Sequence, residues 1–380
     1  MAHPRHDQRR LGHGGLSRRR FLGTGSVALA GAAMPMFSGR LTPSAAAQEN
    51  QIIMTTGGGA WEAAQDIAYF EPFTEETGIE IVKIPEPDLA QVRAMVDTGN
   101  VTFDLSSGTS PSDINVLAEE GKLEAIDYSS FDQETLDGML EDGKHEFGVA
   151  SLYYALIGGY RTDTLSEGPT SWADVWDAEA FPGPRTFGPG LGTSFCTWEI
   201  SLLADGVPPE ELYPIDFDRA LQSLDRIRDE VVTWWDVGGV PAQLLTDGQV
   251  ELGSAWNGRI QALIDEDLPV GINWNQGILQ WDLMYVPKGA PNAENAMMLL
   301  AFMSRAEQQG IFAQNIAYGP SNSDAYEFIP EERAAILPTA PDLVKQLIPQ
   351  DYAFWNSVDS ESGKKMVDVA AERWSEWLIG

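Results

Sequence analysis

Apolar and polar positions alternate with two different periods from residue 51 onward. The run "QIIMTT" (51–56) reads as a short strand, whereas apolar residues recur every three or four positions from Trp61 to Glu75, which predicts a helix. Gly78 then stops the helix and "IEIVKI" (79–84) begins a second strand. This pattern predicts a βαβ unit, whose crossover places the glycines of 57–59 at the carboxyl end of the first strand, where α/β sheets bind ligands.

The same alternation continues along the chain. A strand with a polar loop is expected at 103–110, a helix at 114–127, and a long strand at 146–163 that could carry the chain from one domain to another. "VELGSAWNGRIQALIDED" (250–267) passes from a strand into a helix, and the last third is mainly helical. Strands and helices in alternation indicate parallel sheets covered by helices.

Residues 1–47 are expected to be an export signal. Arg18 and Arg19 follow Ser17 in "LSRRRFLGTGSVALAGAAMPMF", which fits the twin-arginine pattern, and "SAAAQ" offers a cleavage site near Ala47. No Cys lies at that site, so a lipid anchor there is not expected. We therefore expect recognition by the twin-arginine export machinery and a periplasmic or otherwise extracytoplasmic location.

Length and charge narrow the class of protein. Some 333 residues after the signal exceed the usual size of one core, so two domains are expected, with more than one crossing because no single linker divides the chain. Without residues 1–47 the net charge is about −39, since seven Arg and one Asp leave with them. Such a surface repels nucleic acid and anionic membranes, and we interpret most of the charge as adaptation to salt.

The remaining chain holds one Cys, Cys196, and one His, His145. This excludes an intramolecular disulfide and leaves little material for a zinc site or a His-based triad, although a nucleophilic Cys196 with His145 stays open. We expect no metal and no cofactor.

One carboxylate stands out in "WNQGILQWDLMYVP" (274–287). Asp282 follows Trp281 in a run that reads as a buried strand, and no Lys or Arg lies within the stretch. A buried, ionised carboxylate is costly unless it is paired, so either a distant residue or a ligand must supply the partner.

Two further features indicate a site for a small amine. Many Trp residues lie near predicted turns, strand ends or helix starts, and Trp faces beside a carboxylate bind alkylammonium groups. Arg259 lies near the start of a helix, close to Trp256, where it could hold a ligand carboxylate or pair with Asp282. The Trp residues concerned are Trp61, Trp198, Trp234, Trp235, Trp256, Trp274 and Trp281.

Five stretches in order resemble a known family. They are "YFEPFTEETGIEI", "FDLSSGTS" with "LAEEGKLEAID", "DGQVELGSAWNGR", "WDLMYVPKGAPNAENAMMLLAFM" and "AYGPSN". Together they are similar to the periplasmic solute-binding proteins of ABC importers, in the branch that binds polyamines and γ-aminobutyrate.

The resemblance implies an α/β fold with two lobes of the type II-like periplasmic binding protein kind, closing like a hinged clamp over a ligand in the interdomain cleft. We assign 48–158 with 282–323 to lobe 1 and 159–281 with 324–380 to lobe 2. The expected function is capture of a small amine-containing solute, either a polyamine such as putrescine or spermidine or an ω-amino acid such as γ-aminobutyrate. The expected partners are this ligand and the permease subunits of the importer.

The resemblance also implies site residues. Asp282 would take the ligand ammonium, Trp256 and Trp61 would contact the methylene chain, and the hydroxyl loop around Thr109 would line the cleft. Polyamine binders usually carry further acids in the loop that corresponds to 186–199, where this chain has only Glu199. Glu199 or Asp236 could replace those acids, or Asp282 with Arg259 could hold an ω-amino acid. The candidate ligand-binding residues are Asp282, Trp256, Arg259, Trp61, Thr109, Glu199 and Trp281.

Three rival functions remain open. The abundant acids could hide the catalytic pair of a secreted glycosidase or lyase, although no nucleophile motif is present. The protein could also be a receptor for a non-amine solute. A ferric-ion site built from Tyr153 and Tyr154 is disfavoured because neighbours in a strand face opposite sides.

Overall fold

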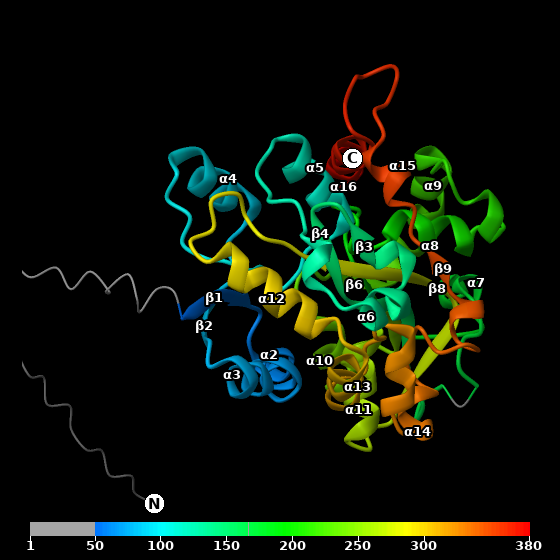
Figure 1. The fold of residues 1–380 in the computed structure, drawn as a ribbon. Coiled ribbons are helices and arrows are strands. Elements are labelled where there is room, and N and C mark those ends of the chain that lie inside the picture. The colour runs from blue at the N-terminus through cyan, green and yellow to red at the C-terminus, as the bar shows by residue number, and fades with distance from the viewer. Residues whose placement is uncertain (1–49, 166) are drawn as a thin grey trace, which may run out of the picture. The chain divides into compact units, whose positions relative to one another are not determined.

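The computed structural model describes residues 50–165 and 167–380. The expected export signal and its cleavage site lie outside the described residues. The chain begins with the predicted βαβ unit, in which β1 (Gln51–Thr56) pairs in parallel with β2 (Glu80–Pro85) (Figure 1). The helix between them is continuous but contains a π-helical turn: α2 (Gly59–Gln65), the π segment Asp66–Phe70 and α3 (Glu71–Thr77). Gly78, with φ 73°, ends it in the left-handed conformation that glycine adopts without strain.

The remaining strands form one mixed sheet. Its order is β6-β5-β7-β4-β8-β9, with β3 paired to β4. The parallel pairs are β5 with β6, β5 with β7 and β8 with β9, whereas β4 runs antiparallel to both β7 and β8. The strands are β3 (Lys144–His145), β4 (Gly148–Arg161), β5 (Arg185–Phe187), β6 (Val231–Trp234), β7 (Leu252–Trp256), β8 (Val270–Met284) and β9 (Ile348–Pro349).

The alternation predicted parallel sheets, and the larger sheet is instead mixed, because its central strands are antiparallel. Strands β4 and β8 are neighbours along almost their whole length, from Val149 opposite Met284 to Arg161 opposite Val270. One carries the chain toward the second lobe and the other brings it back, so the two must run in opposite directions. The strand expected at 103–110 is reduced to two isolated bridges, one between Leu105 and Met54 and one between Thr109 and Leu283.

Helices fill the connections, in agreement with the predicted alternation. Those of the first half of the chain are α4 (Leu89–Thr98), α5 (Pro111–Glu119), α6 (Gln133–Gly138), α7 (Trp172–Trp176) and α8 (Thr197–Ala204). Those of the second half are α9 (Phe217–Ile227), α10 (Val240–Thr246), α11 (Asn257–Asp265), α12 (Ala293–Met303), α13 (Ala306–Asn315), α14 (Glu331–Ala334), α15 (Tyr352–Asn356) and α16 (Met366–Ile379). Short 3₁₀ segments lie at Tyr128–Ser130, Glu141–Gly143, Pro209–Glu211, Arg228–Glu230, Ser323–Phe328 and Val344–Gln346.

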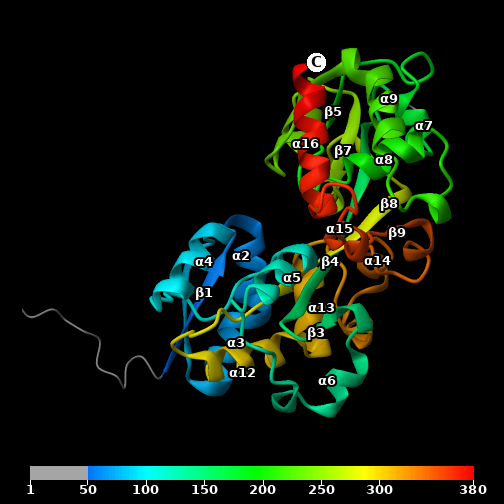
Figure 2. The same ribbon diagram turned by 90° about the horizontal axis from the view of Figure 1, so that it is seen from above.

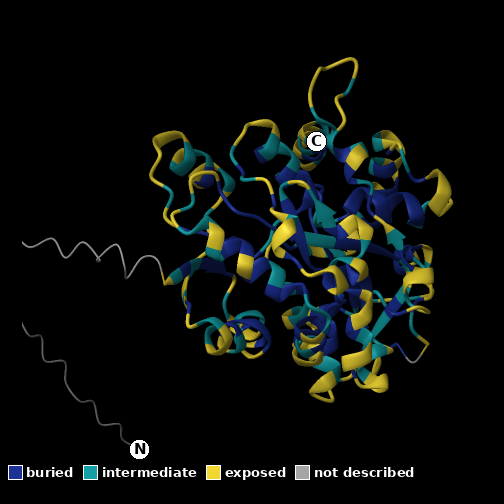
Figure 3. Cartoon of the chain, in the orientation of Figure 1, coloured by how far each residue is buried: buried dark blue, intermediate teal, exposed yellow. Residues whose placement is uncertain are grey.

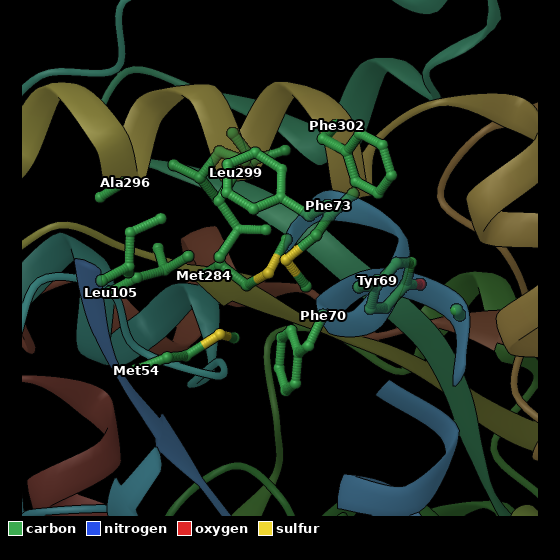
Figure 4. Packing of buried hydrophobic residues seen from close by; sticks show 14 of the residues in the cluster. Met54, Tyr69, Phe70, Phe73, Leu105, Met284, Ala296, Leu299 and Phe302 are labelled. Atoms are coloured by element: carbon green, nitrogen blue, oxygen red, sulfur yellow. The ribbon is translucent and has the colours of Figure 1, made fainter. Parts of the chain in front are cut away.

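Two apolar cores lie in the two lobes, and a third packs against β4 and β8. The first lies under β1 and joins Met54, Phe73 and Met284 to the buried side of α12 (Figure 4). The second is built from α7, α8, α9 and α16 and includes the buried Trp172, Trp198 and Trp374. In Figure 2, β4 and β8 pass between these two groups of elements. Buried residues lie in the interior of the described part of the chain, and exposed residues lie mainly on its loops and outer helix faces (Figure 3).

Candidate functional site

A cavity of about 480 Å³ opens where β4 and β8 pass between the two cores. Its wall is formed by loops that follow β1 and β2, by the residues before α5, by the start of α11 and by the segment after α13. Ligand sites of α/β proteins commonly form where strands end and loops from separate elements converge. Five of the seven candidate residues line this cavity: Asp282, Trp256, Arg259, Trp61 and Thr109.

Asp282 lies near the carboxyl end of β8 and is partly exposed toward the cavity. Its Oδ1 accepts a hydrogen bond of 3.3 Å from the hydroxyl of Tyr154 on β4. Burial and the negative charges of Glu86 and Asp113 raise the pKa of Asp282 to about 7. The cause is that the surroundings disfavour the charged form, and only the Tyr154 hydroxyl opposes them.

Arg259 lies in the first turn of α11 with an exposed side chain. Within 50–165 and 167–380, no carboxylate forms an ion pair with it. Burial raises the pKa of Tyr318, while Arg259 lowers it and Asp282 raises it, so both charges lie near this phenol. Arg259 therefore shares the cavity with Asp282 without neutralising it, and the partner of Asp282 is not supplied by this arginine.

Four aromatic residues contribute to the wall that also holds Asp282 and Arg259. The Trp61 ring meets Tyr318 edge to face at 6.0 Å, and Trp256 meets Tyr154 at 6.2 Å. Trp256 is fixed by its Nε1, which donates to the Ser194 carbonyl at 3.3 Å. These four aromatic residues, Trp61, Tyr154, Trp256 and Tyr318, all line the cavity, and their faces suit a methylene chain or a cation.

Thr109 is held against β8 by two backbone hydrogen bonds with Leu283, of 3.1 and 2.8 Å. Its hydroxyl donates to Oδ2 of Asp113 at 2.9 Å, and the hydroxyl of Ser110 donates to the same oxygen. Asp113 thus has its own donors inside the protein. Thr109 contributes to the shape of the wall, and its hydroxyl hydrogen bonds to Asp113.

The structure does not bring Glu199 to the cavity wall. This residue is fully buried on α8, where Oε1 accepts hydrogen bonds from Tyr213, Gln350 and Trp355 at 2.9, 3.1 and 2.9 Å. Burial raises its pKa above the ordinary value. Every residue from Thr197 to Leu203 is buried, so an acid on this helix points into the second core. Asp236 is exposed and does not line the cavity either.

Trp281 also lies away from the cavity, since neighbours on a strand alternate between its two faces. Its ring packs against Tyr352 at 4.9 Å and Tyr153 at 5.6 Å. Tyr153 and Tyr154 do face opposite sides, as expected, because Tyr154 lines the cavity and Tyr153 does not. Among the described residues, no group of three or more His, Cys, Asp or Glu is placed to hold a metal ion.

Sequence reasoning missed several residues of the wall. Glu86 directly follows β2, so its place at a strand end could have indicated it. Tyr318 belongs to the "AYGPSN" stretch, so that motif could have indicated it. No sequence pattern indicated Arg333. It reaches the cavity from α14, and it forms an ion pair of 3.1 Å with Asp265 and donates to the Ala313 carbonyl.

Together, the two lobes, the crossing strands and the open cavity define a solute-binding protein. The model of the bacterial extracellular solute-binding proteins matches residues 68–339. The chain is 33% identical over 330 residues to a γ-aminobutyric acid-binding protein of Pseudomonas aeruginosa, covering 85% of this chain and 91% of the relative.

Two further similarities agree. A spermidine/putrescine-binding periplasmic protein of Haemophilus influenzae is 27% identical over 299 residues, covering 74% of this chain and 79% of the relative. The solved structure of an ABC transporter substrate-binding protein from Bradyrhizobium japonicum has a TM-score of 0.79 and 33% identity, covering 86% of this chain and 99% of that chain.

The chain belongs to the bacterial extracellular solute-binding proteins and has the role of a substrate-binding protein of an ABC importer. Such proteins bind small-molecule ligands outside the inner membrane and work with permease subunits. No helix in the described part of the chain has the length and apolar character needed to cross a bilayer.

Proposed function

We propose that this protein captures a small ω-amino acid of the γ-aminobutyrate type and delivers it to its importer. The observation that carries the proposal is the separation of charge in one cavity. Asp282 and Glu86 have no basic partner among the described residues, and neither has Arg259 an acidic one. A ligand with an ammonium at one end and a carboxylate at the other satisfies both groups.

The roles of the individual residues follow from this pairing. Asp282 accepts hydrogen bonds from the ligand ammonium, and Arg259 donates to the ligand carboxylate, for which a guanidinium offers two parallel N–H groups. Trp61, Trp256 and the Thr109 loop cover the methylene chain between them. Closure of the lobes removes water from both ends, which strengthens the attraction between the ligand and the two charges.

A polyamine is the second candidate ligand, supported by the similarity to the spermidine/putrescine-binding protein. A diamine needs an acceptor at each end. Glu199 and Asp236 do not line the cavity, and the remaining acid near the arginines, Asp265, is paired with Arg333 at 3.1 Å. The electrostatics of the wall therefore favour the amino acid over the diamine.

The proposal includes the division of the chain. We assign 48–158 with 282–323 to lobe 1 and 159–281 with 324–380 to lobe 2, since the first core holds Tyr154, Met284 and Tyr318 and the second begins at Leu156 and includes Trp374. We also retain residues 1–47 as a twin-arginine signal cleaved near Ala47, read by the corresponding export machinery.

A thermal-shift panel tests the function. Purified protein in high salt is heated with γ-aminobutyrate, putrescine, spermidine, choline or glucose, and we expect the largest rise in Tm with γ-aminobutyrate. A ligand present at about 100 times its Kd adds about 2.7 kcal/mol to the stability of the folded state. A clear shift with glucose and none with any amine would discard the proposal, and a larger shift with putrescine would assign the site to diamines.

A further inference from the structure

We propose that Glu86 is a specificity-determining residue of the ammonium end of this cavity, which together with Asp282 selects ligands that carry a primary ammonium. The inference rests on the proposed function and deepens it. It makes the ammonium end a two-acceptor site, so the number of N–H groups on the ligand nitrogen becomes the property that is selected.

The position of Glu86 supports a direct contact. The residue directly follows β2, which ends at Pro85, and it lines the same cavity as Asp282. Of the charged neighbours of Asp282, Glu86 raises its pKa the most, and the Coulomb interaction falls with distance. The geometry agrees, because a Cβ added at Gly108 would lie 3.1 Å from the Cβ of Asp282, and the two residues directly before Gly108, Ser106 and Ser107, hold the Glu86 carboxylate.

The hydrogen bonds of Glu86 leave it capacity for a ligand. Oε1 accepts a hydrogen bond of 3.2 Å from Ser106, and Oε2 accepts one of 3.3 Å from Ser107. Each carboxylate oxygen has two lone pairs, so each hydroxyl occupies one of them. These contacts orient the carboxylate, and the side chain remains exposed in the open cavity.

Asp113 provides the contrast. It lines the same cavity and also raises the pKa of Asp282, but less than Glu86 does. Both Thr109 and Ser110 donate to its Oδ2 at 2.9 Å at the start of α5. Because the proposal places the ligand contact on Glu86 and not on Asp113, neutralising Asp113 removes one negative charge from the same cavity and is the control for charge alone.

The chemical consequence concerns the ligand nitrogen. A primary ammonium has three N–H groups and can donate to Asp282 and Glu86 together, whereas a trimethylammonium has none and interacts with the two acids through charge alone. Hydrogen bonds to a charged group contribute about 1.5–3 kcal/mol. The preference for the primary amine should therefore depend on Glu86.

The experiment measures Kd by calorimetry for γ-aminobutyrate and for its N,N,N-trimethyl analogue, with the parent, Glu86→Gln and Asp113→Asn, at pH 8.5, where Asp282 is ionised in all three. We expect Glu86→Gln to weaken γ-aminobutyrate binding roughly 10- to 100-fold and to reduce the preference over the trimethyl analogue about tenfold. Asp113→Asn should weaken both ligands about equally, by roughly threefold or less. Thermal unfolding of the empty variants verifies that both fold.

The outcomes separate the two proposals. Equal losses in Glu86→Gln and Asp113→Asn, with the preference for the primary amine unchanged, would refute the role of Glu86 and leave the proposed function standing. Failure of the parent to bind γ-aminobutyrate while it binds a sugar would refute the proposed function itself.

Discussion

The hydroxyl of Tyr154 donates a hydrogen bond of 3.3 Å to Oδ1 of Asp282 across the two central strands β4 and β8. Within the described residues it is the only side-chain hydrogen bond to this carboxylate, and it does not offset the burial and the two neighbouring acids that raise the pKa of Asp282 to about 7. The cavity thus holds an acid that is costly to ionise without a cation beside it.

Replacement of Asp282 by Asn should separate binding from stability. We expect Asp282→Asn to weaken γ-aminobutyrate binding about 100-fold, because a charge-assisted hydrogen bond is lost. The empty variant should be more stable than the parent at pH 8. The folded pKa of about 7 lies above the ordinary 3.8, so ionising Asp282 costs the folded state stability as pH rises from about 4 to about 7.

Calorimetry and thermal unfolding at pH 5 and pH 8 measure both effects. The stability gain should be clearly smaller at pH 5 than at pH 8, because the loss in the parent begins near pH 4 and is complete only near pH 7. If the variant binds γ-aminobutyrate as tightly as the parent does, Asp282 is not a ligand residue and our site assignment fails.

Affinity should depend on pH through the same group. The ligand ammonium favours ionised Asp282, so below pH 7 binding must release a proton from the acid. We expect Kd for γ-aminobutyrate to rise roughly tenfold between pH 8 and pH 6. Calorimetry in buffers of different ionisation enthalpy would detect the released proton, and a flat profile in the parent would contradict the titration of Asp282 at the site.

Arg259 should recognise the carboxylate end alone. We expect Arg259→Gln to weaken γ-aminobutyrate binding roughly 10- to 100-fold, because a bidentate charged contact is lost, and to change butylamine binding little. Arg305→Gln is the matched control, since Arg305 pairs with Glu76 at the surface and does not line the cavity. An equal loss for both ligands would show that Arg259 acts on the fold of the cavity and not on the carboxylate.

Glu199 should matter for stability and not for ligand choice. Glu199→Ala leaves Tyr213, Gln350 and Trp355 without their buried acceptor and should cost about 2–3 kcal/mol of unfolding free energy. Glu199→Gln keeps an oxygen acceptor, and because burial raises the pKa of Glu199, it should become more stable relative to the parent as pH rises above the ordinary value of 4.5. Denaturant unfolding at pH 5 and pH 8 measures this. If Glu199→Gln changes which of γ-aminobutyrate and putrescine binds more tightly, Glu199 does take part in ligand binding.

Much of the fold could be predicted from the sequence, because the spacing of apolar residues and the glycines that end helices are local properties of the chain. The first βαβ unit, the long strand at β4 and the passage from β7 into α11 all follow from apolar spacing and glycine stops. Alternation along a strand also predicted that Tyr153 and Tyr154 face opposite sides. The direction of β4 relative to its neighbours was not accessible, because a strand pattern carries no information on which strand lies beside it.

The sequence by itself determined that Asp282 is a carboxylate in an apolar strand with no local partner, and that aromatic residues and Arg259 lie near turns. Only the tertiary structure decided which of these meet. It places Glu86 and Arg333, from elements far apart in the chain, in the wall of the cavity. It also buries the side chain of Glu199 in the second core. The physical reason is that a residue's neighbours across a cavity depend on the packing of whole helices and strands, whereas its own conformation depends mainly on the few residues beside it.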